Sequence, residues 1–280
     1  LGKLLLFCFC LGNFWVYGQE IMPIYSPNHQ LRLSVVRSVA GSLTYQLGYK
    51  SKEVIGASSL GIVLKKPAVS LQSFEVLGVD TLSHNEIWTP VWGEEREIRN
   101  QYAQLIVHGK SEGILVDFIF RVFNDGIGFR YHFPEQFGFQ HFIVNEELSQ
   151  FRMLGDHTAF WIPGDYDTNE YTYQKTRISE IDAFSAAAKE KDIALTSLIG
   201  PKVVQSPLMM KSANGIYINI HEAALINYPV MHLGLSGLTI ISTLTPDAVG
   251  NKAYLQTPFS TPWRTILISD RAEDILASRL

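Results

Sequence analysis

Residues 114–133 read ILVDFIFRVFNDGIGFRYHF and carry the clearest structural signal in the chain. Every second residue from Val116 to Val122 is apolar, which is typical of a β-strand that buries one face. The pair Asp125-Gly126 predicts a turn, and residues 127–133 alternate in the same way on the return. Apolar residues also occur on the opposite faces, so both sides of this hairpin should be covered. Such a hairpin is expected near the middle of two stacked sheets.

Outward from this hairpin, alternation predicts roughly a dozen strands in all. Residues 31–36 and 43–49 form one further expected hairpin, and residues 207–211 with 215–220 form another. At most two short helices are expected. The sequence therefore predicts an all-β fold, a sandwich of large antiparallel sheets.

The amino-acid composition indicates a globular β-rich chain and argues against a nucleic-acid-binding function. The chain has 280 residues, of which 46% are hydrophobic and 12% aromatic, enough for a large core. Aromatic residues suit both a β-sheet core and a surface that stacks on sugar rings. The formal net charge is −4 and no basic block occurs, so nucleic acid is not an expected partner.

Residues 1–18 resemble a secretory signal peptide, because a short apolar run follows Lys3 and small or polar residues follow at Gly18. The run is too short to span a membrane. Both cysteines lie in this leader, so we expect a periplasmic mature chain without disulfides. The expected domain is residues 19–280, and we expect a larger protein to continue beyond Leu280.

Glu222 is the first candidate functional residue. It ends an alternating strand in the stretch GIYINIHEAAL, residues 215–225. A carboxylate between apolar segments is costly to bury unless a cation, a metal or a sugar hydroxyl pairs with it. The alternative is that Glu222 lies at a strand end in contact with solvent.

A second candidate region follows residue 158 and contains Trp161, Asp165, Tyr166 and Asp167. Carboxylates accept hydrogen bonds from sugar hydroxyls and aromatic rings stack on sugars, so these four residues are candidate substrate-binding residues. The alternative is a turn with Pro-Gly-Asp chemistry.

Nothing in the sequence indicates a complete catalytic centre. It contains no Gly-x-Ser-x-Gly elbow, P-loop or dinucleotide-binding motif, and its spacing pairs no two carboxylates across a glycosidic bond. A charged segment that contains Trp88 and Trp92 is either an exposed loop or a loop that buries both rings against a partner surface.

Five segments resemble the N-terminal domain of glycoside hydrolase family 97. They are spread along the chain after the leader and read WTPVWGEEREIRN (88–100), FNDGIGFRY (123–131), GDHTAFWIPGDYD (155–167), IHEAAL (220–225) and QTPFSTPWRT (256–265). The resemblance implies a β-super-sandwich of the galactose-mutarotase type. It also implies a downstream (β/α)8 barrel that carries the catalytic glutamates, so no catalytic residue is expected in this chain. Family members bind calcium beside the active site, and the position that matches the ligand from the N-terminal domain is Glu222.

The reaction implied is inverting hydrolysis of α-glucosidic bonds in starch-derived oligosaccharides, because the likeness is greater to the periplasmic α-glucosidases of bacterial starch utilisation. Some family members are instead retaining and act on α-galactosides. The base or nucleophile that distinguishes the two mechanisms lies outside this chain. Two other classes remain open: a stand-alone carbohydrate-binding module, stacking sugars on Trp92, Trp161 and Tyr166, and an aldose-epimerase-like enzyme. On a regular strand His221 and Glu222 would face opposite sides, which disfavours the epimerase.

Overall fold

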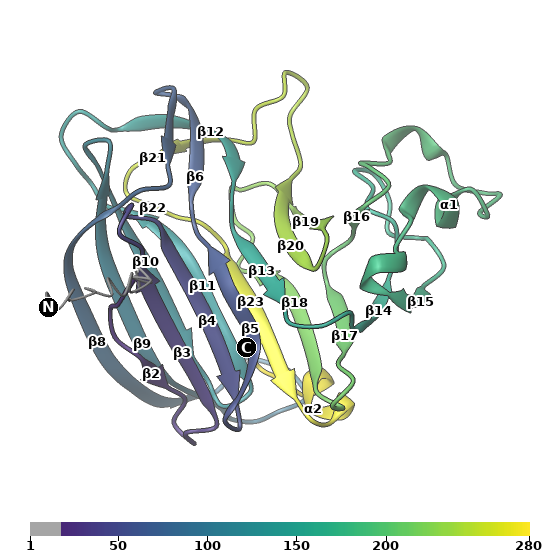
Figure 1. Cartoon of the computed structure of the whole chain (residues 1–280), viewed down its shortest axis with the longest axis horizontal. Helices are drawn as coiled ribbons and strands as arrows, with labels where there is room; N and C mark the ends of the chain where they lie inside the picture. The colour runs from purple at the N-terminus through teal and green to yellow at the C-terminus, as the bar shows by residue number, and fades with distance from the viewer. Residues whose placement is uncertain (1–17) are drawn as a thin grey trace, which may run out of the picture.

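The computed structural model describes residues 18–280, and the predicted leader lies almost wholly outside this range. The described chain forms three antiparallel sheets with a few short helices, of which α1 (Ala183–Ala187) and α2 (Ala272–Leu276) lie at separate places on the margin of the molecule (Figure 1). This architecture confirms the predicted all-β sandwich. Within the described residues no helix is both long enough and apolar enough to cross a membrane.

The first sheet has nine strands in the order β1-β3-β4-β5-β13-β20-β19-β16, with β2 paired to β3. Its strands are β1 (Gln19–Glu20), β2 (Ile24–Tyr25), β3 (Leu31–Arg37), β4 (Leu43–Tyr49), β5 (Lys52–Ser59), β13 (Gln150–Met153), β16 (Val203–Val204), β19 (Met231–Ser236) and β20 (Thr239–Leu244). The expected hairpin of residues 31–36 with 43–49 is confirmed as β3 and β4.

The second sheet has ten strands in the order β15-β14-β17-β18-β23-β11-β10-β9-β8, with β22 paired to β11. Its strands are β8 (Glu75–Trp88), β9 (Ile98–Ser111), β10 (Ile114–Val122), β11 (Gly126–Phe133), β14 (Thr158–Trp161), β15 (Gln174–Arg177), β17 (Leu208–Lys211), β18 (Tyr217–Ala223), β22 (Phe259–Ser260) and β23 (Trp263–Ser269). The expected hairpin of residues 207–211 with 215–220 is confirmed as β17 and β18.

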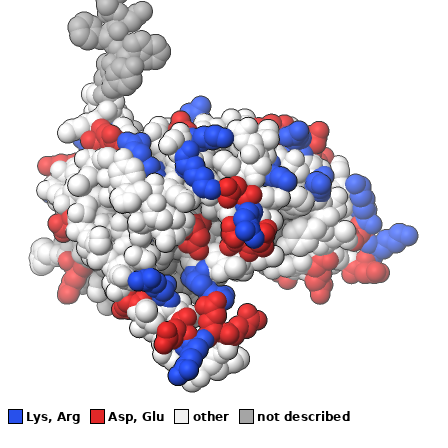
Figure 2. Space-filling view, turned by 90° about the horizontal axis from the view of Figure 1, so that it is seen from below, with Lys and Arg blue, Asp and Glu red and all other residues white. Residues whose placement is uncertain are grey.

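The third sheet has four strands in the order β21-β12-β6-β7. Its strands are β6 (Ile62–Lys66), β7 (Val69–Leu71), β12 (His141–Glu147) and β21 (Ala253–Gln256), and the helices are the 3-10 turns η1 (Ile178–Glu180) and η2 (Leu195–Ser197) with α1 (Ala183–Ala187) and α2 (Ala272–Leu276). Acidic and basic side chains are interspersed on the face shown in Figure 2.

Aromatic residues join the sheets into one core. Tyr45 of the first sheet has its ring centroid 5.1 Å from that of Phe129 in the second sheet. Phe133 of the second sheet lies 4.7 Å from Phe142 of the third, measured in the same way. All four side chains are buried. These aromatic residues therefore form part of the hydrophobic core rather than a sugar-binding surface.

The predicted central hairpin of residues 114–133 is confirmed, but Gly126 is not needed for the turn as expected. β10 pairs with β11 as an antiparallel hairpin, with Phe120 opposite Phe129. Gly126 is the first residue of β11 rather than part of the turn, and its φ is not in the left-handed region. A Cβ atom there would lie 2.4 Å from the carbonyl oxygen of Ile266. Glycine is needed because β23 approaches closely.

The segment that contains Trp88 and Trp92 is the tip of a long hairpin. Strands β8 and β9 pair from Glu75 to Trp88, so only residues 89–97 form the loop. Trp88 is 46% exposed and Trp92 is 89% exposed. In the described part of the chain, the rings of Trp88 and Trp92 are therefore accessible to solvent.

Tyr131 links three parts of the core by one hydroxyl. Its Oη accepts a hydrogen bond from the backbone N–H of Gly61 (3.0 Å) and lies 2.9 Å from Oγ of Ser149. The side chain is 1% exposed. Burial is the main cause that raises the pKa of Tyr131 well above its usual value, so the phenol stays neutral.

We predict that Tyr131→Phe lowers the free energy of unfolding by about 1–3 kcal/mol, because the buried N–H of Gly61 loses its acceptor. Urea denaturation followed by circular dichroism measures the change. Tyr173→Phe is the matched control, since Tyr173 is 63% exposed and should tolerate the same change with little effect. Equal effects of the two substitutions would contradict the role of the Tyr131 hydroxyl.

Candidate functional site

Glu222 lies near the end of β18, opposite Arg264 of β23. Its Oε2 accepts a hydrogen bond from Nη1 of Arg264 (2.6 Å), and its Oε1 accepts one from the backbone N–H of Met231 (3.0 Å). The Glu222 side chain is 10% exposed. The carboxylate is thus held at both oxygens and still reaches the surface.

Arg264 is fully buried and is shared by two carboxylates. Its Nε and Nη2 donate to the two carboxylate oxygens of Glu147 at 2.8 and 2.7 Å, the planar bidentate arrangement that suits guanidinium. Glu147 is also fully buried and accepts a further hydrogen bond from the hydroxyl of Tyr228 (3.1 Å). The ring of Tyr228 lies 5.6 Å from Cζ of Arg264. Every strong donor of Arg264 therefore faces a carboxylate.

The two carboxylates differ in their electrostatics. Burial alone would raise the pKa of Glu147, but the charge and hydrogen bonds of Arg264 outweigh burial and lower it. For Glu222, burial dominates and raises the pKa in spite of Arg264, with Glu147 adding to the rise. The ion pair of Glu147 with Arg264 therefore stabilises the folded state fully at pH values above the pKa of an unfolded glutamate. This stabilisation is lost as the pH falls through the lowered pKa of Glu147 in the folded state.

This network joins the three sheets. Glu147 ends β12 of the third sheet, and Arg264 and Glu222 belong to the second. Met231 begins β19 of the first sheet. With both carboxylates ionised, two negative charges face one positive charge. Glu222, the more exposed carboxylate, is then the place where a further cation would be attracted.

His221 and Glu222 point to opposite sides of the second sheet, as a regular strand requires. Nδ1 of His221 lies 2.7 Å from Oγ1 of Thr265, whereas Glu222 contacts Arg264 on the inner face. His221 and Glu222 therefore do not form an acid–base pair, which disfavours the hypothesis of an aldose-epimerase-like enzyme.

Trp161 and Asp165, two of the four candidate sugar-binding residues, are buried. Trp161 is 2% exposed and its Nε1 donates to Oγ1 of Thr176 (3.0 Å). Asp165 is 1% exposed and accepts hydrogen bonds from the hydroxyls of Tyr171 (2.7 Å) and Ser197 (2.6 Å). Burial would raise the pKa of Asp165, but the donated hydrogen bonds outweigh burial and lower it. Both side chains stabilise the local fold.

Tyr166 and Asp167 lie nearer the surface. Tyr166 is 39% exposed and its ring packs edge-on against His232, with centroids 5.6 Å apart. The backbone N–H of Asp167 donates to Asp165, as the predicted turn would require, and its side chain is exposed. The four candidates therefore do not share one exposed face, and their binding of sugar stays a prediction.

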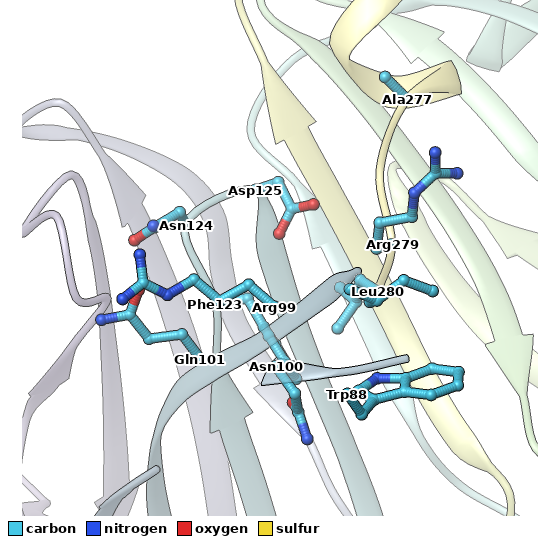
Figure 3. A pocket seen from close by; sticks show the side chains of 11 residues that line it. Trp88, Arg99, Asn100, Gln101, Phe123, Asn124, Asp125, Ala277, Arg279 and Leu280 are labelled. Carbon is cyan, nitrogen blue, oxygen red and sulfur yellow. The ribbon is translucent and has the colours of Figure 1, made fainter. Parts of the chain in front are cut away.

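A surface cavity of about 440 Å³ lies apart from Glu222, beside the end of the β8–β9 hairpin (Figure 3). Trp88, Phe123 and Leu280 are among its lining residues. Among its lining residues in the described part of the chain, Asp125 is the one with an acidic side chain, and it accepts a hydrogen bond from the hydroxyl of Ser278 (2.6 Å). Glycoside hydrolysis requires two carboxyl groups across the scissile bond, so this cavity alone does not supply that chemistry.

Within residues 18–280, no group of three or more His, Cys, Asp or Glu side chains is placed to hold a metal ion. Glu222 therefore offers at most one carboxylate to a metal whose other ligands come from elsewhere. The residues that position Glu222 were not predicted. Glu147 and Arg264 are 117 positions apart, and neither stands out from its neighbours in sequence.

Comparison with known proteins shows the family. A family model described as glycosyl-hydrolase 97 N-terminal matches residues 24–280. A retaining α-galactosidase of Bacteroides thetaiotaomicron is 23% identical over 295 residues, which cover 94% of this chain and 41% of the relative.

Solved structures give the same result for the fold. A glycoside hydrolase family 97 enzyme from Pseudoalteromonas sp. strain K8, in complex with acarbose, is 29% identical with a TM-score of 0.80, over 92% of this chain and 37% of that chain. A variant of that enzyme was solved in complex with panose. A β-arabinopyranosidase is 20% identical with a TM-score of 0.74, over 89% of this chain and 40% of that chain. The chain thus spans about two-fifths of the length of these relatives.

We predict that Glu147→Gln lowers the free energy of unfolding by about 3–5 kcal/mol, because it removes the main counter-charge of a fully buried guanidinium. Glu222→Gln should cost less than about 2 kcal/mol, because Arg264 keeps its bidentate partner and burial already disfavours the charge of Glu222. Urea denaturation of both variants gives the comparison. A larger loss for Glu222→Gln than for Glu147→Gln would contradict this ranking.

Proposed function

The chain belongs to the glycosyl-hydrolase 97 N-terminal family, and from this premise we propose that it is the N-terminal domain of a calcium-dependent α-glucosidase. In this proposal the whole protein hydrolyses α-glucosidic bonds of starch-derived oligosaccharides with inversion. The catalytic carboxylates belong to a downstream (β/α)8 barrel. The chain supplies one calcium ligand and part of the active-site wall, and the protein is secreted to the periplasm.

The observation that carries the proposal is the state of Glu222. Its carboxylate is fixed by Arg264 and by the N–H of Met231, yet it remains partly exposed at a strand end. An ordinary surface glutamate needs no buried guanidinium to hold it. Fixing a carboxylate in this way is typical of a residue whose oxygens must meet a defined partner.

The donor set of Glu222 fits one ligand of calcium. A carboxylate has about four lone-pair directions, and hydrogen bonds occupy two of them here. Calcium takes six to eight oxygen ligands, so most of them would come from other parts of the protein. When bound, calcium would supply a fixed positive charge that orients carboxylates near the substrate. Arg264 orients Glu222, and Glu147 keeps Arg264 in place.

A retaining α-galactosidase is the second candidate, because the Bacteroides thetaiotaomicron relative carries that activity. We favour the glucosidase because identity is higher, at 29%, to an enzyme solved with acarbose and, as a variant, with panose, an oligosaccharide of α-linked glucose. Assay of the full-length protein on chromogenic α-glucoside and α-galactoside separates the two activities. Faster turnover of the α-galactoside would reject the glucosidase.

We predict that Glu222→Ala in the full-length protein lowers calcium content and activity while the sandwich stays folded. The physical reason is the loss of one anionic oxygen ligand. Loss of a group that merely orients a metal ligand typically costs about 10–100-fold in metal affinity, so loss of the ligand itself should cost at least as much. Metal analysis after dialysis measures calcium directly, and circular dichroism checks the fold.

Glu53→Gln serves as the control, because Glu53 is an exposed carboxylate on β5. It should leave both calcium content and activity unchanged. Normal calcium retention in Glu222→Ala would remove Glu222 from the metal site. Loss of activity with calcium retained would point instead to a role in the pocket wall.

We further predict that Trp88 and Trp92 become buried against the barrel or the interdomain linker in the full-length protein. Large exposed aromatic side chains close together on a surface commonly mark a contact with a partner surface. Acrylamide quenching of tryptophan fluorescence, with Trp88→Phe and Trp92→Phe to assign the signals, should show less quenching in the full-length protein than in the 280-residue chain. Equal quenching in both would refute this contact, and the buried Trp161 should be protected in each.

A further inference from the structure

The outer face of the second sheet carries a cluster of two arginines and a tryptophan. Arg121 of β10 and Arg130 of β11 alternate with buried core residues, so they point away from the core. Trp263 of β23 lies two residues before Thr265, the ladder partner of Gly128, and is therefore on the same outer face. Arg121 lies opposite Gly128 in the ladder between β10 and β11. These adjacent strands bring the three side chains together on one surface.

Gly128 allows the Trp263 ring to lie flat on the sheet. A Cβ atom at Gly128 would lie 3.2 Å from the Trp263 ring. Both guanidinium groups lie over that ring, with Cζ of Arg121 4.7 Å and Cζ of Arg130 4.4 Å from its centroid. Arg121 also lies 4.4 Å from the ring centroid of Tyr102. The aromatic rings therefore help to hold both guanidinium groups in place.

The charges of this cluster are not compensated within residues 18–280. Neither Arg121 nor Arg130 has a carboxylate oxygen within salt-bridge distance among the ion pairs of the described chain. Nε of Arg121 donates to the amide oxygen of Gln104 (2.9 Å), whereas Nε of Arg130 is buried without a partner. Burial, and next the charge of Arg121, lower the pKa of Arg130. The two cations thus destabilise each other in the absence of an anion.

A small cavity opens beside the cluster. Its volume is about 160 Å³, and Arg121, Trp263 and Thr265 are among its lining residues. Arg279 also lines it, but that guanidinium pairs with Glu95. Of the two clustered arginines, Arg121 lines the cavity and Arg130 lies outside its lining, and the volume has room for a small anionic group.

We propose that Arg121 and Arg130 together bind a carboxylate at the edge of Trp263. A planar guanidinium presents its N–H donors in a fork that matches carboxylate geometry, and stacking on an aromatic ring leaves those in-plane donors free. A carboxylate at these half-exposed guanidinium groups would accept hydrogen bonds from their N–H donors and would remove the repulsion between the two cations. The carboxylate can be carried by a sugar acid or by an acidic side chain of another polypeptide segment.

The test is a titration of the purified 280-residue chain with sodium acetate and, at equal ionic strength, with sodium chloride. NMR signals of the Trp263 indole N–H and of the Nε–H groups of Arg121 and Arg130 report on the site. Acetate should cause saturable shifts in these signals, and chloride should cause much weaker ones. Equal responses to acetate and chloride, or no saturable response to acetate, would overturn the proposal.

Two variants test the arginines themselves. Arg121→Gln with Arg130→Gln should weaken acetate binding by at least about tenfold, because both forks are lost. Arg121→Lys with Arg130→Lys keeps the charge and the fold but removes the forks, so it should lose the preference for acetate over chloride. Arg271→Gln, at an exposed arginine paired with Glu273, should change nothing. Undiminished acetate preference in the lysine variant would also overturn the proposal.

Glucuronate and glucose separate the two sources of the carboxylate. Affinity for glucuronate at least about tenfold above acetate would identify a sugar acid as the ligand, because the ring would add contacts. Equal affinities for glucuronate and acetate would identify an acidic side chain as the natural occupant. Glucose lacks the carboxylate, so binding of glucose as tight as that of glucuronate would contradict a carboxylate site.

Discussion

The fold depends on one buried cation. Arg264 is wholly removed from solvent, and a guanidinium in that position is tolerated only when anions occupy its donors. Glu147 and Glu222 supply those anions from two different sheets, and Met231 of the remaining sheet fixes Glu222. The sheets must therefore meet at this point in one relative placement. Apolar packing alone, such as that of Tyr45 on Phe129, would accept small shifts that the bidentate pair does not.

The same cation gives its two carboxylates different properties. Glu147 is held at zero exposure with its pKa lowered, so it acts as a permanent counter-charge. Glu222 shares Arg264 through a single donor and keeps contact with the surface, and burial raises its pKa. A group in this position gains most from a second cation. Glu147 is thus the main counter-charge of Arg264, and Glu222 is the carboxylate of the pair that stays partly exposed.

Alternation in the sequence was sufficient for the fold class and for the main hairpins, because the period of two reports directly which face is buried. It also singled out Glu222 as a candidate, since a carboxylate at the end of an apolar strand is unusual, and its role as a metal ligand stays a prediction. It could not identify Glu147 or Tyr228, because their partner Arg264 is distant in sequence and only the meeting of sheets brings them together. Local pattern likewise did not separate the buried Asp165, which binds its own loop, from the exposed Asp167.

The register of β23 determines both faces of the second sheet at once. Successive residues of a strand point to opposite faces, so Trp263 faces outward and Arg264 faces the core. A slip by one residue would place the indole against Glu147 and the guanidinium in the outer cluster, leaving a buried carboxylate without its cation. Gly128 favours the same register from the outside, because a Cβ atom there would come within 3.2 Å of the Trp263 ring. The outer arginine cluster and the inner ion network are therefore not independent features. Each favours the same register of β23, in which Arg264 lies opposite Glu222.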